Sequence, residues 1–241
     1  SRNRVQTFKK KSRNSLKTRI QTCHKMVKKQ GTSILPGNSM VKHVTNIPST
    51  NRMKPKIVAC IPAYNEENSI GEVIGRTIAV MESLKRPYEI IVVDDGSTDK
   101  TPEIASKYKV TVLLNRRNMG KGYALRRGIE HAKGQIIVTL DSDGSHDPKE
   151  IPNLIEPLYN GIDLTAGSRF LGNKKNATTK LNRIGNILIN LMIMALTGKY
   201  ITDSQTGFRA FKREILKKLN PKAEKYEFET EVTVKGLNLS L

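Results

Sequence analysis

From residue 56 onward, short runs of apolar residues alternate with longer segments in which apolar and polar positions repeat with the spacing of a helix. The short runs predict strands, and several are nearly continuous in isoleucine, valine and leucine. Such continuity is typical of strands that are covered on both faces. We predict strands at residues 56–61, 89–93, 110–114, 135–140 and 163–166.

The segments between these strands predict helices at residues 68–84, 101–107, 121–132 and 148–159. Strands and helices alternate through short connections, which is the signature of βαβ units around a mostly parallel sheet. We therefore expect an α/β protein with a doubly wound, mostly parallel sheet and helices on both faces. Ligands of such sheets bind outside the carboxyl ends of the strands.

Residues 1–54 differ from the rest of the chain in charge and in pattern. They hold fourteen Lys or Arg and no Asp or Glu, within a chain whose net charge is +20. They show neither alternation nor helical periodicity, so they cannot bury enough apolar surface to offset the entropy of ordering. We expect a disordered tail or a mis-called upstream segment there, a native start at Met53, and one domain over residues 55–241.

Strong basicity also fits a nucleic-acid-binding protein, because Lys and Arg displace counterions from a phosphate backbone. Such proteins commonly stack bases on aromatic side chains, and residues 1–54 contain one aromatic residue, Phe8. Nucleic-acid binding therefore stays an alternative interpretation of the basic charge, and we expect no nucleic-acid partner.

Cysteine content and hydropathy bear on location. Cys23 lies in the basic tail and Cys60 inside an apolar run, so the sequence indicates no disulfide framework and fits a reducing compartment. No run reaches the ~18 apolar residues of a spanning helix. Residues 182–200 are apolar with basic flanks, which fits a helix at the membrane interface, or alternatively a buried helix or dimer face. We expect a cytoplasmic protein, peripheral on the cytoplasmic face of the membrane.

Polar side chains follow three of the predicted strands, beginning with the first two. After the first strand, a base can stack on Tyr64 while Glu66 accepts a hydrogen bond from a ribose hydroxyl or a base edge. The alternative is a strand-to-helix turn in which Asn65 caps the helix. After the second strand, residues 94–99 offer several acceptors and a glycine turn, which suit a nucleoside or simply cap the next helix.

Two carboxylates follow the fourth strand, in Asp141-Ser142-Asp143. They can converge on one hard cation, and Mg²⁺ or Mn²⁺ commonly keeps one or two carboxylates while it bridges substrate phosphates. The alternative is a solvated turn, to which His146 would also belong unless it acts as a further ligand.

A glycine-containing helix start lies at residues 115–124. Its backbone N–H groups and the cation of Lys121 can meet phosphate. The spacing of a Walker A loop is absent, so a P-loop kinase is disfavoured.

Six short segments along the chain form one ordered set. They are Pro62-Ala63-Tyr64-Asn65-Glu66, residues 94–99, residues 118–122, Asp141-Ser142-Asp143, Gly167-Ser168-Arg169 and Thr206-Gly207-Phe208-Arg209. In order and spacing they resemble family 2 glycosyltransferases, nearest the dolichyl-phosphate mannose synthase-like branch. The resemblance runs from about Lys56 to Val234 and implies a GT-A fold, that of the nucleotide-diphospho-sugar transferases.

The resemblance also implies roles for single residues. The nucleoside would be held by Pro62, Tyr64, Glu66, Val93 and Asp95. Mg²⁺ or Mn²⁺ would bridge the diphosphate from Asp141 and Asp143, with Ser142 beside them. Phosphate would be contacted by two residues whose planar guanidinium suits it, Arg169 and Arg209. The residues expected to act in catalysis are Asp143, Arg169 and Arg209.

Two departures from the family's pattern stand out. Mannose synthases of this kind often carry Gln or Glu two residues after the second aspartate, where this chain has Ser145, which bears on metal affinity and ion preference. Residues 226–231 resemble the family's acidic helix, after which relatives usually continue beyond the position of Leu241. We therefore expect a C-terminal truncation.

The expected reaction moves a sugar, with inversion, from GDP-mannose or a UDP-sugar to a polyprenyl or dolichyl phosphate, for glycoprotein or cell-envelope glycan synthesis. A phosphate monoester, whose second pKa is near ~6, is already anionic and needs no general base. The alternative acceptor is a sugar hydroxyl in polysaccharide synthesis. A carboxylate must then take the proton, and Asp203 is the candidate.

Overall fold

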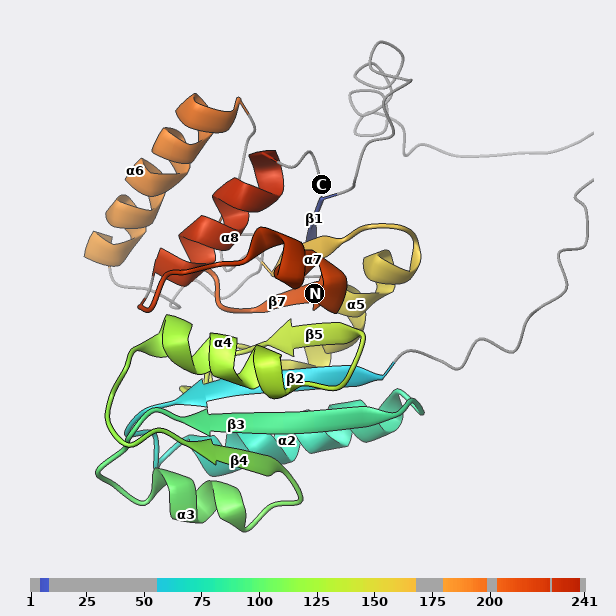
Figure 1. Cartoon of the computed structure of the whole chain (residues 1–241), viewed down its shortest axis with the longest axis vertical. Helices are drawn as coiled ribbons and strands as arrows, with labels where there is room; N and C mark the ends of the chain where they lie inside the picture. The colour runs from blue at the N-terminus through green and yellow to red at the C-terminus, as the bar shows by residue number, and fades with distance from the viewer. Residues whose placement is uncertain (1–4, 9–55, 168–179, 199–202, 226, 239–241) are drawn as a thin grey trace, which may run out of the picture. The chain divides into compact units, whose positions relative to one another are not determined.

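A computed structural model of the chain describes residues 5–8, 56–167, 180–198, 203–225 and 227–238. Their strands form one seven-stranded sheet, in the order β1-β6-β7-β5-β2-β3-β4, and helices cover both faces (Figure 1). This confirms the α/β fold class and the doubly wound arrangement.

The strands run largely in one direction. Strand β2 pairs in parallel with β3 and β5, and β3 pairs in parallel with β4. Strand β7 is antiparallel to both β5 and β6, and β1 is antiparallel to β6. Their bounds are β1 (Val5–Phe8), β2 (Ile57–Ala63), β3 (Tyr88–Asp94), β4 (Thr111–Leu114), β5 (Ile136–Thr139), β6 (Leu164–Gly167) and β7 (Arg209–Lys212).

The helices fall where the pattern predicts them, with additions near the C-terminus. The predicted helix at 148–159 is divided, because Asp147 accepts a hydrogen bond from the Lys149 amide and opens a short 3₁₀ turn first. The bounds are α2 (Ile70–Ser83), α3 (Thr101–Ser106), α4 (Lys121–His131), η1 (Pro148–Glu150), α5 (Ile151–Tyr159), α6 (Lys180–Thr197), α7 (Arg213–Leu219) and α8 (Glu227–Asn238).

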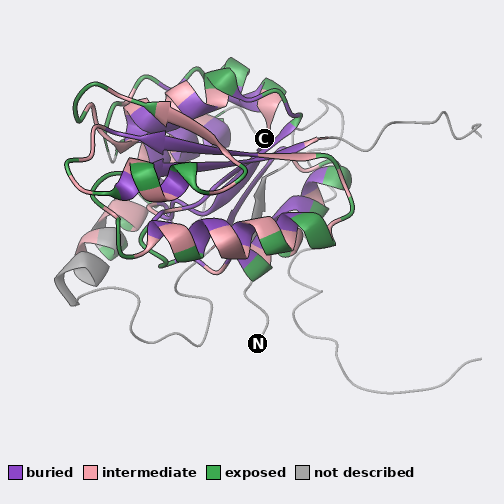
Figure 2. Ribbon diagram, turned by 90° about the horizontal axis from the view of Figure 1, so that it is seen from below, coloured by how far each residue is buried: buried purple, intermediate pink, exposed green. Residues whose placement is uncertain are grey.

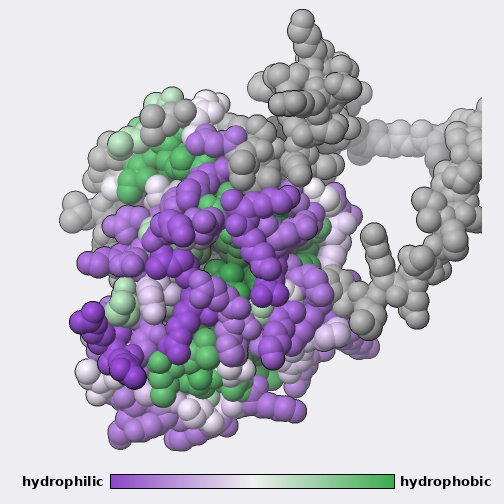
Figure 3. All heavy atoms as spheres, viewed as in Figure 1, coloured by the Kyte–Doolittle hydropathy of each residue, from purple (hydrophilic) through white to green (hydrophobic). Residues whose placement is uncertain are grey.

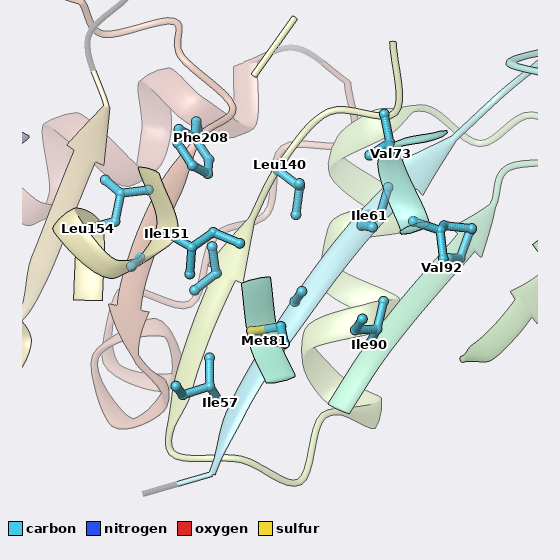
Figure 4. Close-up of a cluster of buried hydrophobic side chains, with 14 of the residues drawn as sticks. Ile57, Ile61, Val73, Met81, Ile90, Val92, Leu140, Ile151, Leu154 and Phe208 are labelled. Atoms are coloured by element: carbon cyan, nitrogen blue, oxygen red, sulfur yellow. The ribbon is translucent and has the colours of Figure 1, made fainter. Parts of the chain in front are cut away.

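Two hydrophobic clusters hold the layers together, one on each face of the sheet. Along β2, Ile57 and Ile61 belong to the cluster under α2 and α5 (Figure 4). Val58 and Cys60 belong to the cluster under α4, α7 and α8. Strand residues alternate between the faces, so a strand buried on both sides is apolar throughout. Figure 2 shows the buried sheet between helices whose outer faces are exposed.

Cys60 packs as a small apolar side chain. It is fully buried, and burial raises the pKa of its thiol to about 12. A Cβ added to Gly128 of α4 would lie 2.4 Å from the Cys60 Sγ atom. The absence of a side chain at Gly128 therefore lets α4 pack closely on β2, which sets the position of the N-terminus of α4 at the strand ends.

Strand β2 is longer than predicted at its carboxyl end. It includes Pro62 and Ala63, which pair with Val93 and Asp94 of β3 alone, because the pairing with β5 stops at Cys60. A proline, which cannot donate a ladder hydrogen bond, is tolerated where one side of the strand has no partner.

Two strands were not predicted from the sequence. Strand β7 is four residues long, and two of these, Arg209 and Lys212, are charged. Strand β1 departs from the expectation that residues 1–54 lack regular structure, and the rest of that segment lies outside the described residues. None of the helices that the structure describes is long and apolar enough to cross a bilayer.

Candidate active site

A pocket of about 430 Å³ opens at the carboxyl ends of β2, β3 and β5, beside the N-terminus of α4. In Figure 1 the arrowheads of these strands point to this edge. The residues around it combine an aromatic face, four carboxylates and two lysines. They are Pro62, Ala63, Tyr64, Glu66, Asp95, Asn118, Gly120, Lys121, Ala124, Asp141, Ser142, Asp143 and Lys225.

Hydrogen bonds between two loops hold together the wall of the pocket that carries Tyr64. The amide of Asn65 donates to the Ser97 hydroxyl at 2.9 Å, and the Asn65 side-chain oxygen accepts from the Thr98 amide at 2.8 Å. Asn65 therefore joins the loops after β2 and β3, and the alternative in which it caps a helix is wrong. Tyr64 remains 43% exposed, so its ring is open to a planar ligand.

Glu66 is held on the same wall. Its amide donates to the Thr101 hydroxyl at 2.7 Å, and its Oε2 atom accepts from the Ser69 hydroxyl at 2.7 Å. The carboxylate is thus fixed at the pocket, half-buried, and retains acceptor capacity for a ligand hydroxyl or N–H group.

Asp95 shapes another part of the pocket lining. Its buried carboxylate accepts hydrogen bonds from the Asn115 side chain at 2.6 Å, from the Met119 amide at 3.0 Å and from the Gly120 amide at 2.7 Å. Carboxylates hold amide donors strongly because the hydrogen bonds are charge-assisted. Asp95 therefore orders the loop that leads into α4, and it also lines the pocket.

The carboxylates of Asp141 and Asp143 face the pocket after β5. Asp143 is exposed and accepts from the Ser145 amide at 2.9 Å, which fixes the turn. Asp141 packs closely against the loop before β7, since a Cβ added to Gly207 of that loop would lie 2.4 Å from the Asp141 Oδ1 atom. Only a glycine fits at this approach, so the loop defines where the carboxylate stands.

These two carboxylates fit a hard divalent cation that also binds a diphosphate. Among the described residues, no group of three or more His, Cys, Asp or Glu side chains is arranged to hold a metal. Mg²⁺ commonly takes one or two carboxylates and completes its shell with phosphate and water oxygens. The donor set of Asp141 and Asp143 therefore suits a cation that arrives with its phosphate ligand.

His146 supports Asp141. Its Nδ1 atom accepts a hydrogen bond from the Asp141 amide at 3.2 Å, and its ring stacks on Phe208 with 5.2 Å between centroids. The residue is buried, and the accepting Nδ1 atom is engaged by the backbone. We conclude that His146 positions the turn after β5.

Lys121 reaches across the pocket from the first residue of α4. Its ammonium lies 2.7 Å from Asp141 Oδ1 and 2.8 Å from Glu229 Oε1 of α8. Burial alone would lower the pKa of Lys121, but the two carboxylates outweigh burial and hold it above its ordinary value. The amine is therefore charged throughout the physiological range.

Comparison with known proteins agrees with this geometry. Residues 58–220 match the family described as Glycosyl transferase family 2. The chain belongs to glycosyl transferase family 2.

Two relatives show which proteins this glycosyltransferase is similar to in sequence. It is 37% identical over 164 residues to an undecaprenyl-phosphate 4-deoxy-4-formamido-L-arabinose transferase of Edwardsiella ictaluri, covering 65% of this chain and 49% of that protein. It is 40% identical over 190 residues to an uncharacterized protein of Methanocaldococcus jannaschii, covering 75% of each chain. The chain thus spans about half the length of the named transferase.

The fold matches glucosyl-3-phosphoglycerate synthase from Mycobacterium tuberculosis, solved with Mn²⁺, uridine diphosphate and phosphoglyceric acid. The TM-score is 0.61 with 28% identity, over 74% of this chain and 63% of that one. The same synthase has also been solved with Mg²⁺ and uridine diphosphate. These matches confirm the GT-A fold.

Most residues expected at the glycosyltransferase site meet in the pocket. Those that line it are Pro62, Tyr64, Glu66, Asp95, Lys121, Asp141, Ser142 and Asp143. Val93 does not, because its side chain is fully buried in the cluster under α4. Arg169 lies outside the described residues.

Arg209 is placed differently from the expectation that it contacts phosphate. It is 1% exposed and does not line the pocket. Its guanidinium donates to the carbonyl oxygens of Thr206 and Ser204 at 2.8 and 2.6 Å, and to the Thr233 hydroxyl at 2.8 Å. In this arrangement Arg209 ties the loop that carries Gly207 to α8, and the expected phosphate contact stays a prediction.

Asp203, the candidate general base, is also buried. It is 1% exposed, accepts from the Gln205 amide at 3.2 Å and is absent from the pocket lining. In this arrangement its carboxylate stabilises the loop before β7.

Four site residues were not singled out from the sequence for the roles that the structure gives them. Asn118 and Lys225 line the pocket, Gly207 abuts Asp141, and Glu229 pairs with Lys121. Asn118, Gly207 and Glu229 lie in segments that carry the family resemblance, and this resemblance was the signal available in the sequence. The contacts of Gly207 with Asp141 and of Glu229 with Lys121 join residues more than sixty positions apart, so they depend on the fold.

Proposed function

We propose that this glycosyltransferase moves a sugar from a nucleoside-diphosphate donor to a polyprenyl phosphate, with inversion at the anomeric carbon. The observation that carries the proposal is the convergence of an open aromatic face, Tyr64, with paired carboxylates, Asp141 and Asp143, in one pocket. An aromatic face suits the base, and the carboxylates suit a cation that bridges the diphosphate.

Each wall of the pocket has a part in donor binding. The base would stack on Tyr64, and Glu66 would accept a hydrogen bond from the ribose or base. Asp141 and Asp143 would hold Mg²⁺ or Mn²⁺, which supplies charge neutralisation to the diphosphate. The Lys121 ammonium, 2.7 Å from Asp141 Oδ1, would present a second positive charge to the leaving phosphates.

A phosphate acceptor matches the residues at the pocket. The phosphate oxygen of a lipid monoester is anionic at neutral pH and can attack without losing a proton first. The carboxylates in the pocket can then serve cation and donor binding, and Asp203 need not act as a base. The related undecaprenyl-phosphate transferases carry this acceptor class in their name.

An exposed apolar face on α6 further supports a lipid acceptor. Ile187, Leu191 and Met194 follow helical spacing and are 50%, 50% and 36% exposed, and Met192 beside them is 64% exposed. Figure 3 shows this apolar patch over α6. Such a face suits the interfacial region of a bilayer. It supports the part of the proposal in which the protein lies peripherally on the cytoplasmic face of the membrane.

A transfer assay tests the proposal. The full chain is incubated with labelled GDP-mannose or UDP-sugars and undecaprenyl or dolichyl phosphate, with Mn²⁺, Mg²⁺ or EDTA, and lipid-linked sugar is extracted and measured. We expect cation-dependent formation of a sugar–phosphate–lipid with release of nucleoside diphosphate.

Parallel reactions with phosphoglyceric acid and with sugar acceptors distinguish the alternative. Transfer to one of these hydroxyl compounds, without transfer to lipid phosphate, would overturn the acceptor assignment and leave the donor site intact. Absence of transfer from every donor to every acceptor would contradict the glycosyltransferase activity proposed for this chain.

A further inference from the structure

Three charged side chains from separate elements meet beside the pocket. Lys121 begins α4, Asp141 follows β5, and Glu229 lies in the first turn of α8. The Lys121 Nζ atom is 2.7 Å from Asp141 Oδ1 and 2.8 Å from Glu229 Oε1. One ammonium therefore serves two carboxylates at once.

The two carboxylates differ in their surroundings. The Glu229 side chain is 3% exposed, and apart from Lys121 neither of its oxygens has a hydrogen-bond donor among the described residues. A buried carboxylate without a partner is strongly destabilising. Glu229 therefore holds the Lys121 ammonium more strongly than the carboxylate of an exposed ion pair would.

Asp141 is the carboxylate whose ion pair with Lys121 can be replaced by another cation. Its side chain is 25% exposed and lines the pocket, where it is one of two carboxylates suited to a divalent cation. The ammonium already neutralises its Oδ1 atom. A divalent cation that binds Asp141 must therefore compete with Lys121 or force two positive charges together.

We propose that Lys121 is the counterion of Asp141 in the empty pocket and that its ammonium moves to the donor diphosphate when cation and nucleotide bind together. Glu229 is the residue that positions Lys121. This inference rests on the function proposed above and concerns the order of binding at the same site. A divalent cation alone competes with Lys121, whereas a diphosphate offers the ammonium new anionic acceptors.

The consequence is cooperative binding of cation and diphosphate. If the diphosphate removes Lys121 from Asp141, it raises the affinity for the cation, and the cation raises the affinity for the diphosphate by the same factor. The pocket is then neutralised by Lys121 when empty and by the divalent cation when the donor is bound. Cation binding without donor is suppressed.

Electron paramagnetic resonance titration of Mn²⁺ tests the proposal without any catalytic readout. The chain is titrated alone and with saturating UDP or GDP. In the wild type we expect the better of the two nucleotides to strengthen Mn²⁺ binding by at least about tenfold, within the usual range of coupling between sites.

The main variant is the double substitution Lys121→Met, Glu229→Gln, which removes the ammonium and avoids leaving Glu229 charged and unpaired. We expect it to bind Mn²⁺ alone about tenfold more tightly than the wild type does, and to lose most of the gain from nucleotide. The single variant Glu229→Gln leaves the ammonium to Asp141 alone, so it should bind Mn²⁺ alone more weakly than the wild type does.

Lys225→Met is the matched control, because Lys225 lines the same pocket and has no ion pair to Asp141 among the described residues. An equal rise in Mn²⁺ affinity in this control would show a general field effect and overturn the proposal. So would a double variant with wild-type Mn²⁺ affinity and wild-type coupling. A wild type that binds no Mn²⁺ with either nucleotide would instead overturn the proposed function itself.

Discussion

Asp95 and Asp141 stand at the same edge of the sheet, beyond strands that flank β2 on either side. Asp95 is buried and accepts hydrogen bonds from two backbone amides and one side-chain amide. Asp141 is partly exposed, pairs with a lysine, and abuts a glycine. Asp95 therefore orders a loop through its hydrogen bonds, whereas Asp141 faces the pocket and pairs with a lysine side chain. The donors around each carboxylate decide which of these two roles an aspartate has.

The largest expected effect concerns the exposed carboxylate on the Asp141 side of the pocket. Asp143→Ala should lower the rate of transfer by about 10³-fold, or ~4 kcal/mol, because it removes a cation ligand, while the melting temperature changes little. The control is Glu130→Ala, an exposed carboxylate of α4 outside the pocket. Full activity of Asp143→Ala would refute the metal assignment.

The next effect tests the loop that supports Asp141. Arg209→Ala should lower the free energy of unfolding by about 3 kcal/mol, because three hydrogen bonds of a buried guanidinium are lost. Arg209→Lys should recover only part of this, since one ammonium cannot reach all three acceptors in the same geometry. Urea denaturation measures both. Wild-type stability combined with a selective loss of turnover would restore the phosphate-contact hypothesis for Arg209.

A smaller effect is expected on the Asp95 side. Asp95→Asn keeps the shape of the side chain but loses the charge that holds the Met119 and Gly120 amides. We expect a loss of about 2 kcal/mol in the free energy of unfolding, with weaker nucleotide binding as the loop loosens. Chemical denaturation and calorimetric titration with UDP or GDP provide the measurements. Unchanged stability would mean that Asp95 resembles Asp141 more closely than the structure indicates.

The smallest effect lies on α6, away from both aspartates. Met192→Glu should weaken binding to vesicles that contain anionic lipid by roughly threefold, and leave the free energy of unfolding within about 0.5 kcal/mol. Leu114→Glu is the matched control, because Leu114 is 58% exposed on β4. Equal losses of vesicle binding in both variants would indicate net charge and not the α6 face as the cause.

Much of the fold could be predicted because its central strands are apolar on both faces. The run at residues 57–61 reads as a covered strand whatever its partners are. Strand β7 could not be predicted in this way, since it is short and begins with Arg209. That arginine is buried where the loop carbonyls and the Thr233 hydroxyl accept its hydrogen bonds, and these are contacts of the folded chain.

The site was predictable to the extent that strand ends carry it. Tyr64, Asp95 and Asp141 follow three strands, and parallel strands bring their carboxyl ends to one edge. The sequence could not reveal which acceptors are already saturated. It also could not pair Lys121 with Glu229, since that contact requires α8 to pack beside α4.

Crystallographic location of Mn²⁺ and a nucleoside diphosphate is the direct test of the proposed donor site. Crystals of the full chain are grown with Mn²⁺ and UDP or GDP, and anomalous diffraction is recorded at the manganese edge. The predicted result is one anomalous peak between the Asp141 and Asp143 carboxylates and the diphosphate, with the base against Tyr64. A base bound elsewhere, or an anomalous peak away from both carboxylates, would contradict the donor site described for this glycosyltransferase.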